Sequence, residues 1–147
     1  MASEKAQAAD SGPRPIVPFL RLEPKPHLVG IRCSCGAIYV DLNRVACSRC
    51  GSAGPFEQVS FSGKGSVYVF SVVHQSFPGI PTPYITAIVD LAEGAAIRGN
   101  LLDFPPEQAQ RDPHKVFGLP VEMVTRVVAK DREGRDVVAF GFRPAKR

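Results

Sequence analysis

The chain has 147 residues, a formal net charge of +4 and an apolar fraction of 44%, which leaves room for one ordinary domain, or for a small domain plus a unit stabilised by something other than a hydrophobic core. It contains no apolar run long enough to span a bilayer, and residues 1–15 lack the apolar stretch of a signal peptide, so we expect a soluble, cytoplasmic protein with no membrane partner. The basic residues are scattered, without the dense run that marks a nucleic-acid patch.

The first residues predict a tail. Residues 1–18 are polar and then punctuated by proline, which is typical of a flexible segment. Residues 19–27 begin like a helix, but Pro24 and Pro26 remove backbone donors and clash with the preceding turn, so we expect at most a short helical piece. The chain then divides into a flexible tail over residues 1–18, a cysteine-bearing unit with its lead-in over 19–56 and a larger domain over 57–147.

All four cysteines lie within one short stretch, as two pairs that are each followed by glycine: Cys33, Cys35, Cys47 and Cys50. In the cytoplasm thiols stay reduced, so clustered cysteines favour metal binding over disulfides. A glycine after the second cysteine of a pair lets the backbone turn tightly, as in a rubredoxin-type knuckle. The first pair is one residue shorter than the usual knuckle. We expect residues 37–40 and 42–46 to form a β-hairpin arm between the two pairs.

These features predict an N-terminal, rubredoxin-like zinc ribbon in which the four thiolates hold a structural Zn²⁺. With four protein ligands the metal would stabilise the fold and would not activate water. Two alternatives remain open. His27 could replace a badly placed Cys33 or Cys35, although the simpler interpretation is a loop residue before a strand. The site could instead have lost its metal, leaving a hairpin held by apolar contacts or by a disulfide.

From residue 63 onward apolar residues alternate with a period of two, which indicates strands. In the first strand we place Val67, Val69, Ser71 and Val73 on one face. A short helix over residues 106–110 interrupts the strands, and a hairpin turn precedes the last one. The five predicted strands span residues 65–74, 83–91, 95–103, 120–130 and 137–144. This layout predicts an all-β chain whose larger domain is a five-stranded OB-fold barrel.

No catalytic constellation is evident. The chain has three histidines, and His74 at the end of the first strand has no orienting partner nearby in sequence. A nucleophile elbow of the G-x-S-x-G type is absent. Residues 60–66 (SFSGKGS) lack the first glycine and the final Ser or Thr of a phosphate-binding loop, and they read better as a hairpin entering the first strand.

Residues 65–74, 83–102 and 118–142, together with the ribbon at 33–51, resemble the zinc-ribbon/OB-fold proteins called domain-of-unknown-function family 35. The resemblance covers residues 28–144. The chain departs from the family in its shortened first knuckle, and in the prolines that cut the element before the ribbon.

The resemblance implies a small, non-catalytic partner of a thiolase-type enzyme, which binds a thiolase-fold subunit and helps to position an acyl-CoA thioester at the shared interface. Candidate relatives include the small subunit of benzoylsuccinyl-CoA-type thiolases, the subunits of steroid side-chain aldolases and those of acetoacetyl-CoA and hydroxymethylglutaryl-CoA assemblies. The sequence does not decide which acyl group the complex would use.

Residues for partner or CoA contact can be chosen on chemical grounds. Phe77, Ile80 and Tyr84 flank a rigid proline-rich loop, and such loops lose little entropy on docking. Lys64 and Arg98 offer cations to the phosphates of CoA. His74 stands at the start of the same loop.

A different class of function competes with this one. OB-fold barrels also bind single-stranded nucleic acid through basic and aromatic side chains. Here the aromatic residues fall mostly on alternating strand positions, where core packing explains them, which disfavours this alternative. A stand-alone hydrolase of CoA thioesters is a third possibility.

Overall fold

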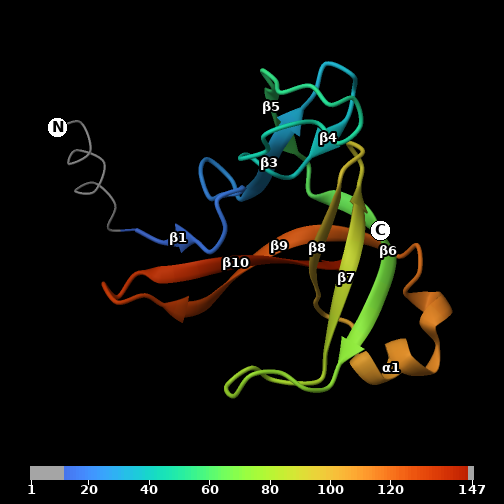
Figure 1. Cartoon of the computed structure of the whole chain (residues 1–147). Helices are drawn as coiled ribbons and strands as arrows, with labels where there is room; N and C mark the ends of the chain where they lie inside the picture. Colours follow the sequence, from blue (N-terminus) through green and yellow to red (C-terminus); the bar gives the residue numbers. More distant parts are fainter. Residues whose placement is uncertain (1–11, 146–147) are drawn as a thin grey trace.

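The computed structural model describes residues 12–145 (Figure 1). Most of the predicted tail therefore lies outside the described residues. Of the helices in the described part, none has the length and apolar character needed to cross a membrane. Strands dominate this part of the chain, as predicted.

The larger unit is a closed barrel of five strands that follow one another along the chain. Its strands are β6 (Lys64–Val73), β7 (Tyr84–Leu91), β8 (Ala96–Leu101), β9 (Pro120–Lys130) and β10 (Asp136–Pro144). They are hydrogen-bonded in the order β10-β8-β7-β6-β9, and pairing of β9 with β10 closes the circle. All pairings are antiparallel except β8 with β10, where Leu101 lies opposite Phe142. The predicted OB-fold barrel is confirmed.

A short helical segment separates β8 from β9, also as predicted. Helix α1 (Pro106–Arg111) is followed by a 3₁₀ turn, η1 (Pro113–Lys115). Pro106 occupies the first turn of α1, where its missing N–H costs no hydrogen bond. Ala109 and Val116 are fully buried in the core cluster. The segment therefore plugs one end of the barrel.

A β-bulge in β6 changes which side chains of that strand face the core. The pairing with β7 shifts register between Val67 and Val69, where Tyr68 is the extra residue. Val67 is buried, but Tyr68 and Val69 are 62% and 38% exposed, and Phe70 and Val72 pack against the core instead. The prediction that Val67, Val69, Ser71 and Val73 share one face is therefore wrong at Val67, which the bulge separates from the other three. A bulge adds one residue to the strand and reverses the alternation that follows it.

The N-terminal unit is a second, smaller sheet built around one central strand. Its strands are β2 (Leu20–Arg21), β3 (His27–Arg32), β4 (Ile38–Tyr39) and β5 (Glu57–Phe61), and β3 pairs with the other three. The segment 19–27 thus contains β2 and no helix. β5 continues this sheet across the predicted domain boundary at 56/57.

The predicted hairpin arm between the cysteine pairs is wrong. Tyr39 of β4 pairs with Ile31 of β3, and residues 42–46 form no strand. The reason lies in the local chemistry of this segment. The Oδ1 of Asp41 accepts a hydrogen bond from the backbone N–H of Asn43 at 3.0 Å. This contact favours a turn, so the chain does not continue as a paired strand.

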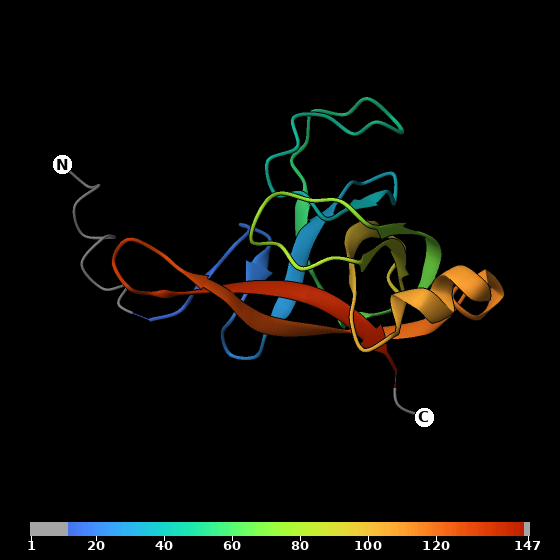
Figure 2. The ribbon, with the colours of Figure 1, turned by 90° about the horizontal axis from the view of Figure 1, so that it is seen from below.

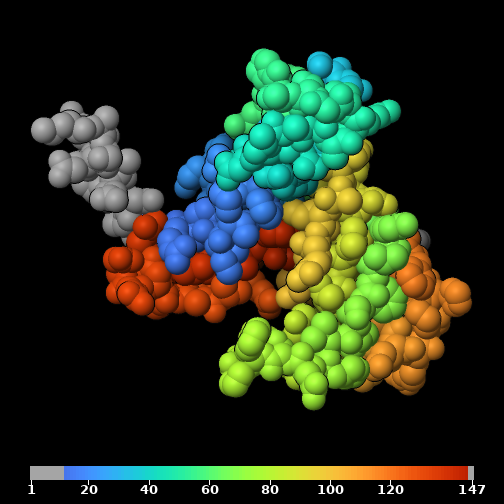
Figure 3. Space-filling model, viewed as in Figure 1, coloured from blue at the N-terminus to red at the C-terminus, as the bar shows by residue number. Residues whose placement is uncertain are grey.

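The two units share one core. Leu20 and Leu28 of the small sheet are fully buried in the cluster that also contains Phe142 of the barrel. The ring of Phe19 meets that of Phe140 edge-on at a centroid distance of 5.8 Å. Figure 3 shows the small sheet seated directly on the barrel. A change in one unit therefore affects the packing of the other.

The β9–β10 hairpin extends well beyond the barrel (Figures 1 and 2). The short strand β1 (Arg14–Pro15) pairs with it in parallel, opposite Val137 and Val138. The Nε of Arg14 donates to the Oδ2 of Asp131 at 2.9 Å, at the tip of this hairpin. Residues 14–15, which the sequence placed in the tail, are thus paired in the sheet.

Candidate functional site

Each cysteine pair sits on a tight turn that ends in a glycine. After β3, the N–H of Cys33 donates to the carbonyl of Ala37, and the N–H of Gly36 donates to the carbonyl of Cys33. In the second turn the N–H of Gly51 donates to the carbonyl of Cys47. Gly36 and Gly51 have φ values of +97° and +80°, which side chains rarely tolerate. The glycine that follows each pair is therefore required by the backbone.

The two turns bring all four sulfur atoms together. Every Sγ lies within 4.8 Å of the other three; the Sγ of Cys33 is 3.5 Å from that of Cys50, and the Sγ of Cys35 is 3.7 Å from that of Cys47. Thiolates on one tetrahedral metal, at about 2.3 Å from the ion, are roughly 3.8 Å apart. All four cysteines are free thiols. The donor set and its spacing therefore fit a single metal ion, despite the one-residue gap in the first pair.

Histidine does not belong to this cluster. Among the residues described, the group that could hold a metal consists of the four cysteines alone. His27 lies in β3, where its Nδ1 donates to the carbonyl of Lys25 at 2.7 Å. The alternative in which His27 replaces a cysteine is not supported by this geometry.

A polar shell surrounds the sulfur of Cys47. The hydroxyl of Tyr39 lies 3.4 Å from this sulfur and 2.9 Å from the Oγ of Ser48, and the N–H of Arg49 donates to the sulfur at 3.4 Å. The guanidinium of Arg44 stacks on the Tyr39 ring at 3.7 Å from the ring centroid. The segment between the cysteine pairs thus supports the sulfur of Cys47 instead of forming the predicted hairpin arm.

The thiols differ in acidity. The hydrogen bond from Tyr39 and the backbone amides of Cys50 and Arg49 lower the pKa of Cys47 to about 6, although burial opposes them. The amide of Ser52 lowers the pKa of Cys50, but contacts with the other thiols and burial outweigh it and raise that pKa to about 11. Several negative charges at this spacing repel one another. A cation between the sulfurs would remove that repulsion.

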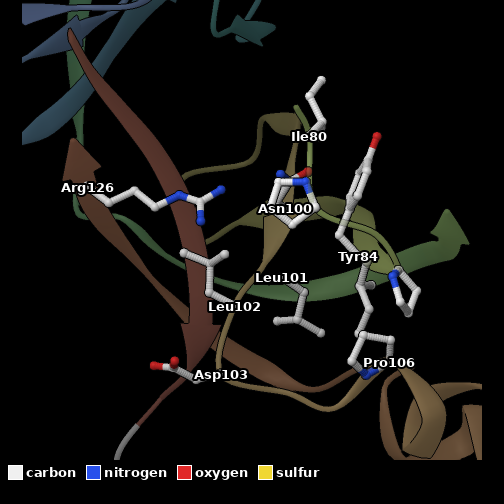
Figure 4. Close-up of a pocket in the computed structure, with 11 residues that line it drawn as sticks. Ile80, Tyr84, Asn100, Leu101, Leu102, Asp103, Pro106 and Arg126 are labelled. Atoms are coloured by element: carbon white, nitrogen blue, oxygen red, sulfur yellow. The ribbon is translucent and has the colours of Figure 1, made fainter. Parts of the chain in front are cut away.

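A groove lies on the outer face of the barrel, away from the cysteines. Two cavities of about 280 and 620 Å³ share Tyr84 and Asn100 as a common wall. The smaller is bordered by Ile80 and Arg126 (Figure 4), and the larger by Arg98. Figure 3 shows the surface hollowed here, between the red β9–β10 hairpin, the gold β8 and the lime loop over residues 74–83. Strands 2 and 3 of an OB barrel, here β7 and β8, commonly carry its binding face.

The structure brings together some of the predicted contact residues and separates others. Ile80, Tyr84 and Arg98 border the groove. His74 and Phe77 lie in the loop between β6 and β7, and Phe77 is 80% exposed. Lys64 begins β6 opposite Glu122, at the other end of that strand, and borders neither cavity.

Sequence reasoning missed two residues of this groove. Asn100 and Arg126 line it from β8 and β9. Asn100 lies in the stretch 83–102 that carries the family resemblance, but its residue type there does not mark it as a contact residue. Only the closure of the barrel brings β9 next to the end of β8. A lone arginine in a strand gives no signal that would have identified it.

Comparison with known proteins places these features in context. Residues 58–126 match the family described as the C-terminal OB-fold domain of ChsH2. The chain is 36% identical, over 79% of both chains, to a DUF35 domain-containing scaffold protein of Methanocaldococcus jannaschii. It is 31% identical to the benzoylsuccinyl-CoA thiolase subunit BbsA of Geobacter metallireducens, over 80% of this chain and 75% of that one. Among solved structures it resembles the Ltp2-ChsH2(DUF35) aldolase, with a TM-score of 0.59 and 29% identity over 80% of this chain and 84% of that one.

Proposed function

The chain belongs to the family of DUF35 domain-containing scaffold proteins, and from this premise we propose that it is a non-catalytic accessory subunit of a thiolase-type acyl-CoA enzyme complex. Its partner would be a thiolase-fold protein, with a CoA thioester bound at the shared interface. Catalysis would reside on the partner.

One observation carries this proposal more than any other. The similarity to the BbsA subunit covers 80% of this chain and 75% of that subunit, so it is not confined to one of the two units. A match that extends over a ribbon and a barrel together concerns the whole arrangement, and not merely the widespread OB fold. The likeness to the ChsH2 part of an aldolase points in the same direction.

The distribution of reactive side chains supports a non-catalytic role. His27, His74 and His114 lie on β3, after β6 and in η1, on separate parts of the described chain. The four cysteines are gathered in one cluster of metal-ligand type. General acid–base or nucleophilic catalysis needs partner groups within hydrogen-bond reach, and the residues that line the groove include neither a histidine nor a cysteine.

We further propose that the cysteine cluster holds Zn²⁺ as a structural ion. Four sulfur donors at tetrahedral spacing suit zinc, and four protein ligands leave no position for water. The small sheet has few apolar side chains of its own, and a metal supplies the stability that such a unit lacks. Reduced thiolate ligands accord with a cytoplasmic location.

The 74–83 loop and the adjoining groove are the proposed contact region for the partner. Phe77 and Ile80 are 80% and 48% exposed, and aromatic side chains of this kind contribute disproportionately to interfaces. His74, Tyr84 and Arg98 lie in the same region and are kept as contact residues. Lys64 is retained only as a peripheral candidate, since it lies away from the groove.

Reconstitution tests this proposal. The full-length, metal-loaded chain is co-expressed with candidate thiolase-fold proteins from its own organism, and complexes are identified by size-exclusion chromatography with mass measurement. We expect a stable heteromer, no turnover of CoA thioesters by the chain alone, and turnover by the complex. Salt-sensitive binding of single-stranded oligonucleotides without a thiolase partner would instead favour a nucleic-acid module.

A further inference from the structure

Beyond the barrel, strand β9 has an edge that no other strand of the described chain covers. Its pairing with β6 ends where the N–H of Met123 donates to the carbonyl of Gly63 at 2.8 Å. From Val124 onward β9 pairs with β10 alone, and β1 lies on the far side of β10. We call residues 124–130 the open edge of β9. The hairpin that carries this edge projects from the rest of the molecule in Figure 2.

The backbone of the open edge offers donors and acceptors to a further strand. Alternate residues of a strand direct their N–H and C=O groups to the same side, so Thr125 and Val127 face outward as Met123 does. The pairing with β10 agrees, because Val138, opposite Val127, accepts a hydrogen bond from the N–H of Ile16 on its other side. An extended row of such groups is a template for an added strand.

A β-bulge limits the regular part of this edge. The register of β9 against β10 shifts between Val137 and Val138, which leaves Val128 as an extra residue on β9. A bulge interrupts the ladder and increases the local twist, so regular pairing stops before Val128. Val127 and Val128 are 56% and 44% exposed, so apolar surface lies beside the outward-facing backbone groups. The edge therefore suits a short extended segment with some apolar side chains.

The charges on the open edge are positive. Beyond Glu122, the charged residues of β9 are Arg126 and Lys130. Lys130 lies 3.2 Å from Asp136, but both side chains are exposed, so solvent screens this pair. Arg126 makes no ion pair with any residue of the described chain. The edge therefore attracts carboxylate groups.

A cavity beside the open edge adds another cation. It has a volume of about 470 Å³ and lies between β9, at Thr125, and the loop before β3, at Lys25. Arg143 also lines it, but Glu122 holds that guanidinium at 2.8 Å. Lys25 makes no ion pair with any residue that the structure describes, and none of the residues lining this cavity is acidic. Lys25 and Arg126 are thus two unpaired cations near the edge.

These charges distinguish between two kinds of occupant. A second copy of this chain would place its own Arg126 and Lys130 against the first basic edge, and like charges on neighbouring strands are destabilising. Edge cations and bulges are devices that prevent such self-pairing. A segment that carries Asp or Glu meets the same cations with opposite charge and is stabilised by them. Glu23 precedes Lys25 in its loop but does not line the cavity, so positive charge prevails there.

We infer that the open edge of β9 binds an extended, acidic segment of a partner protein by strand addition. The main chain of the segment pairs with Thr125 and Val127, and its carboxylates lie near Lys25 and Arg126. This surface goes beyond the proposed function and does not depend on it, because no residue of the 74–83 loop lines the cavity beside the edge.

Peptide binding to the full-length, metal-loaded chain tests the inference by protein NMR. The probe is a short, capped peptide in which Glu and Val alternate. One control peptide has Lys in place of Glu, and the other is the acidic peptide N-methylated at adjacent central residues, which blocks pairing on both of its edges. We expect the acidic peptide to shift the amide signals of Thr125 and Val127 and to slow their hydrogen exchange. Both control peptides should bind about tenfold more weakly or less, since each lacks one part of the recognition.

Charge reversals in the chain provide a second measurement. Lys25→Glu and Arg126→Glu should each weaken binding of the acidic peptide about fivefold or more, because each replaces an attraction by a repulsion. Arg111→Glu, on α1, changes the net charge equally and should leave the affinity unchanged. All three side chains are exposed, so the variants should keep the Tm of wild type. Lys25 borders neither cavity of the groove, so its effect separates the edge from the groove.

Several results would overturn the inference. Equal binding of the acidic and lysine peptides would exclude recognition by charge, and equal binding of the N-methylated peptide would exclude strand addition. Signal shifts at Tyr84 and Asn100 in place of Thr125 and Val127 would assign the peptide to the groove. A dimer of the chain alone that protects the Thr125 and Val127 amides would assign the edge to a second copy.

The inference and the proposed function can fail separately. No binding of the acidic peptide at millimolar concentration contradicts the inference and leaves the proposed function untouched. A chain that forms no heteromer with a thiolase-fold protein, but binds the acidic peptide through Lys25 and Arg126, contradicts the proposed function and supports the inference.

Discussion

The hydroxyl group of Tyr39 lies 3.4 Å from the sulfur of Cys47, and this contact joins strand β4 to the cysteine cluster. The contact forms because residues 42–46 turn back and do not pair as a strand, which lets Arg44 stack on the tyrosine ring. Partners that surround a metal ligand fix its orientation and tune its affinity. The second cysteine turn therefore has a hydrogen-bonding partner beside Cys47, while the first turn is one residue shorter than usual.

Replacement of Tyr39 tests the value of this support. Tyr39→Phe keeps the ring beneath Arg44 but removes the hydroxyl hydrogen bond, so we expect zinc affinity to fall by about tenfold or more. The measurement is competition with a chromophoric chelator. Tyr68→Phe is the matched control, because Tyr68 is exposed on the barrel and distant in sequence from the cluster; its affinity should match wild type. An unchanged affinity for Tyr39→Phe would contradict a role for the hydroxyl.

Removal of the metal should destabilise both units. Leu20, Leu28 and Phe61 of the small sheet are buried in the core shared with the barrel, so loosening the ribbon exposes apolar surface of both. We expect chelation or Cys47→Ser to lower Tm and to shift the NMR signals of both units. Ser34→Ala alters the exposed residue between the first two cysteines and should leave Tm unchanged. A barrel that melts identically with and without metal would show that the ribbon is not coupled to it.

Metal retention should depend on pH, because each sulfur must lose its proton to bind. The pKa of Cys47 is lowered to about 6, so this ligand remains a thiolate to lower pH than an ordinary cysteine, whereas the pKa of Cys50 is raised to about 11. Protons therefore compete with the metal increasingly as pH falls through and below 6. We expect zinc release, followed with a chelating dye, to steepen in that range, and at a higher pH in Tyr39→Phe.

Asp131 should stabilise the β9–β10 hairpin in a pH-dependent way. Burial raises the pKa of its carboxyl group, but the N–H of Arg135, the Arg14 guanidinium and the N–H of Glu133 together hold that pKa below its ordinary value. A carboxyl group whose folded pKa is depressed stabilises the fold above its unfolded pKa of about 3.9 and loses that contribution as pH falls further.

Asp131→Asn should therefore lower Tm at neutral pH and flatten the acid limb of the Tm–pH curve. Asp112→Asn is a suitable control, because within residues 12–145 the only ion pair of the Asp112 side chain is a long, exposed one with Lys115 at 3.9 Å. Parallel acid limbs for wild type and Asp131→Asn would rule out this contribution.

Phe77 tests the proposed contact region. Its side chain is 80% exposed, so Phe77→Ser should leave Tm within the range of ordinary surface substitutions. An aromatic anchor at an interface contributes about 2 kcal/mol or more, so partner affinity should fall about 30-fold. Val45→Ser, on the ribbon and 83% exposed, serves as the control and should retain the affinity of wild type. A Phe77→Ser chain that binds the partner normally would move the interface elsewhere.

The strands of the barrel could be predicted from sequence because their side chains alternate with a period of two. Ile85, Ala87, Val89 and Leu91 are all buried, as that alternation requires. The bulge at Tyr68 could not be predicted, since an extra residue is recognisable only against the paired strand. The family resemblance, by contrast, indicated the barrel and the ribbon together, and both are present.

The cysteine cluster could also be predicted, from the two Cys-Gly turns, but its surroundings could not. Tyr39 and Arg44 resemble ordinary hairpin residues in sequence, and only after the turn at Asp41 does Arg44 stack on the ring of Tyr39, whose hydroxyl contacts Cys47. In the same way Arg126 joins Tyr84 and Asn100 only because β9 and β10 close the barrel. Contacts between residues far apart in the chain depend on closure of the barrel, and barrel closure leaves no local pattern in the sequence.

The mass and activity of the complex reconstituted from this chain and a thiolase-fold protein test the central claim most directly. We expect a stable heteromer that turns over a CoA thioester, while the isolated, metal-loaded chain turns over none. Turnover of a thioester by the isolated chain, or the absence of any heteromer with a thiolase-fold protein at micromolar concentrations, would contradict it.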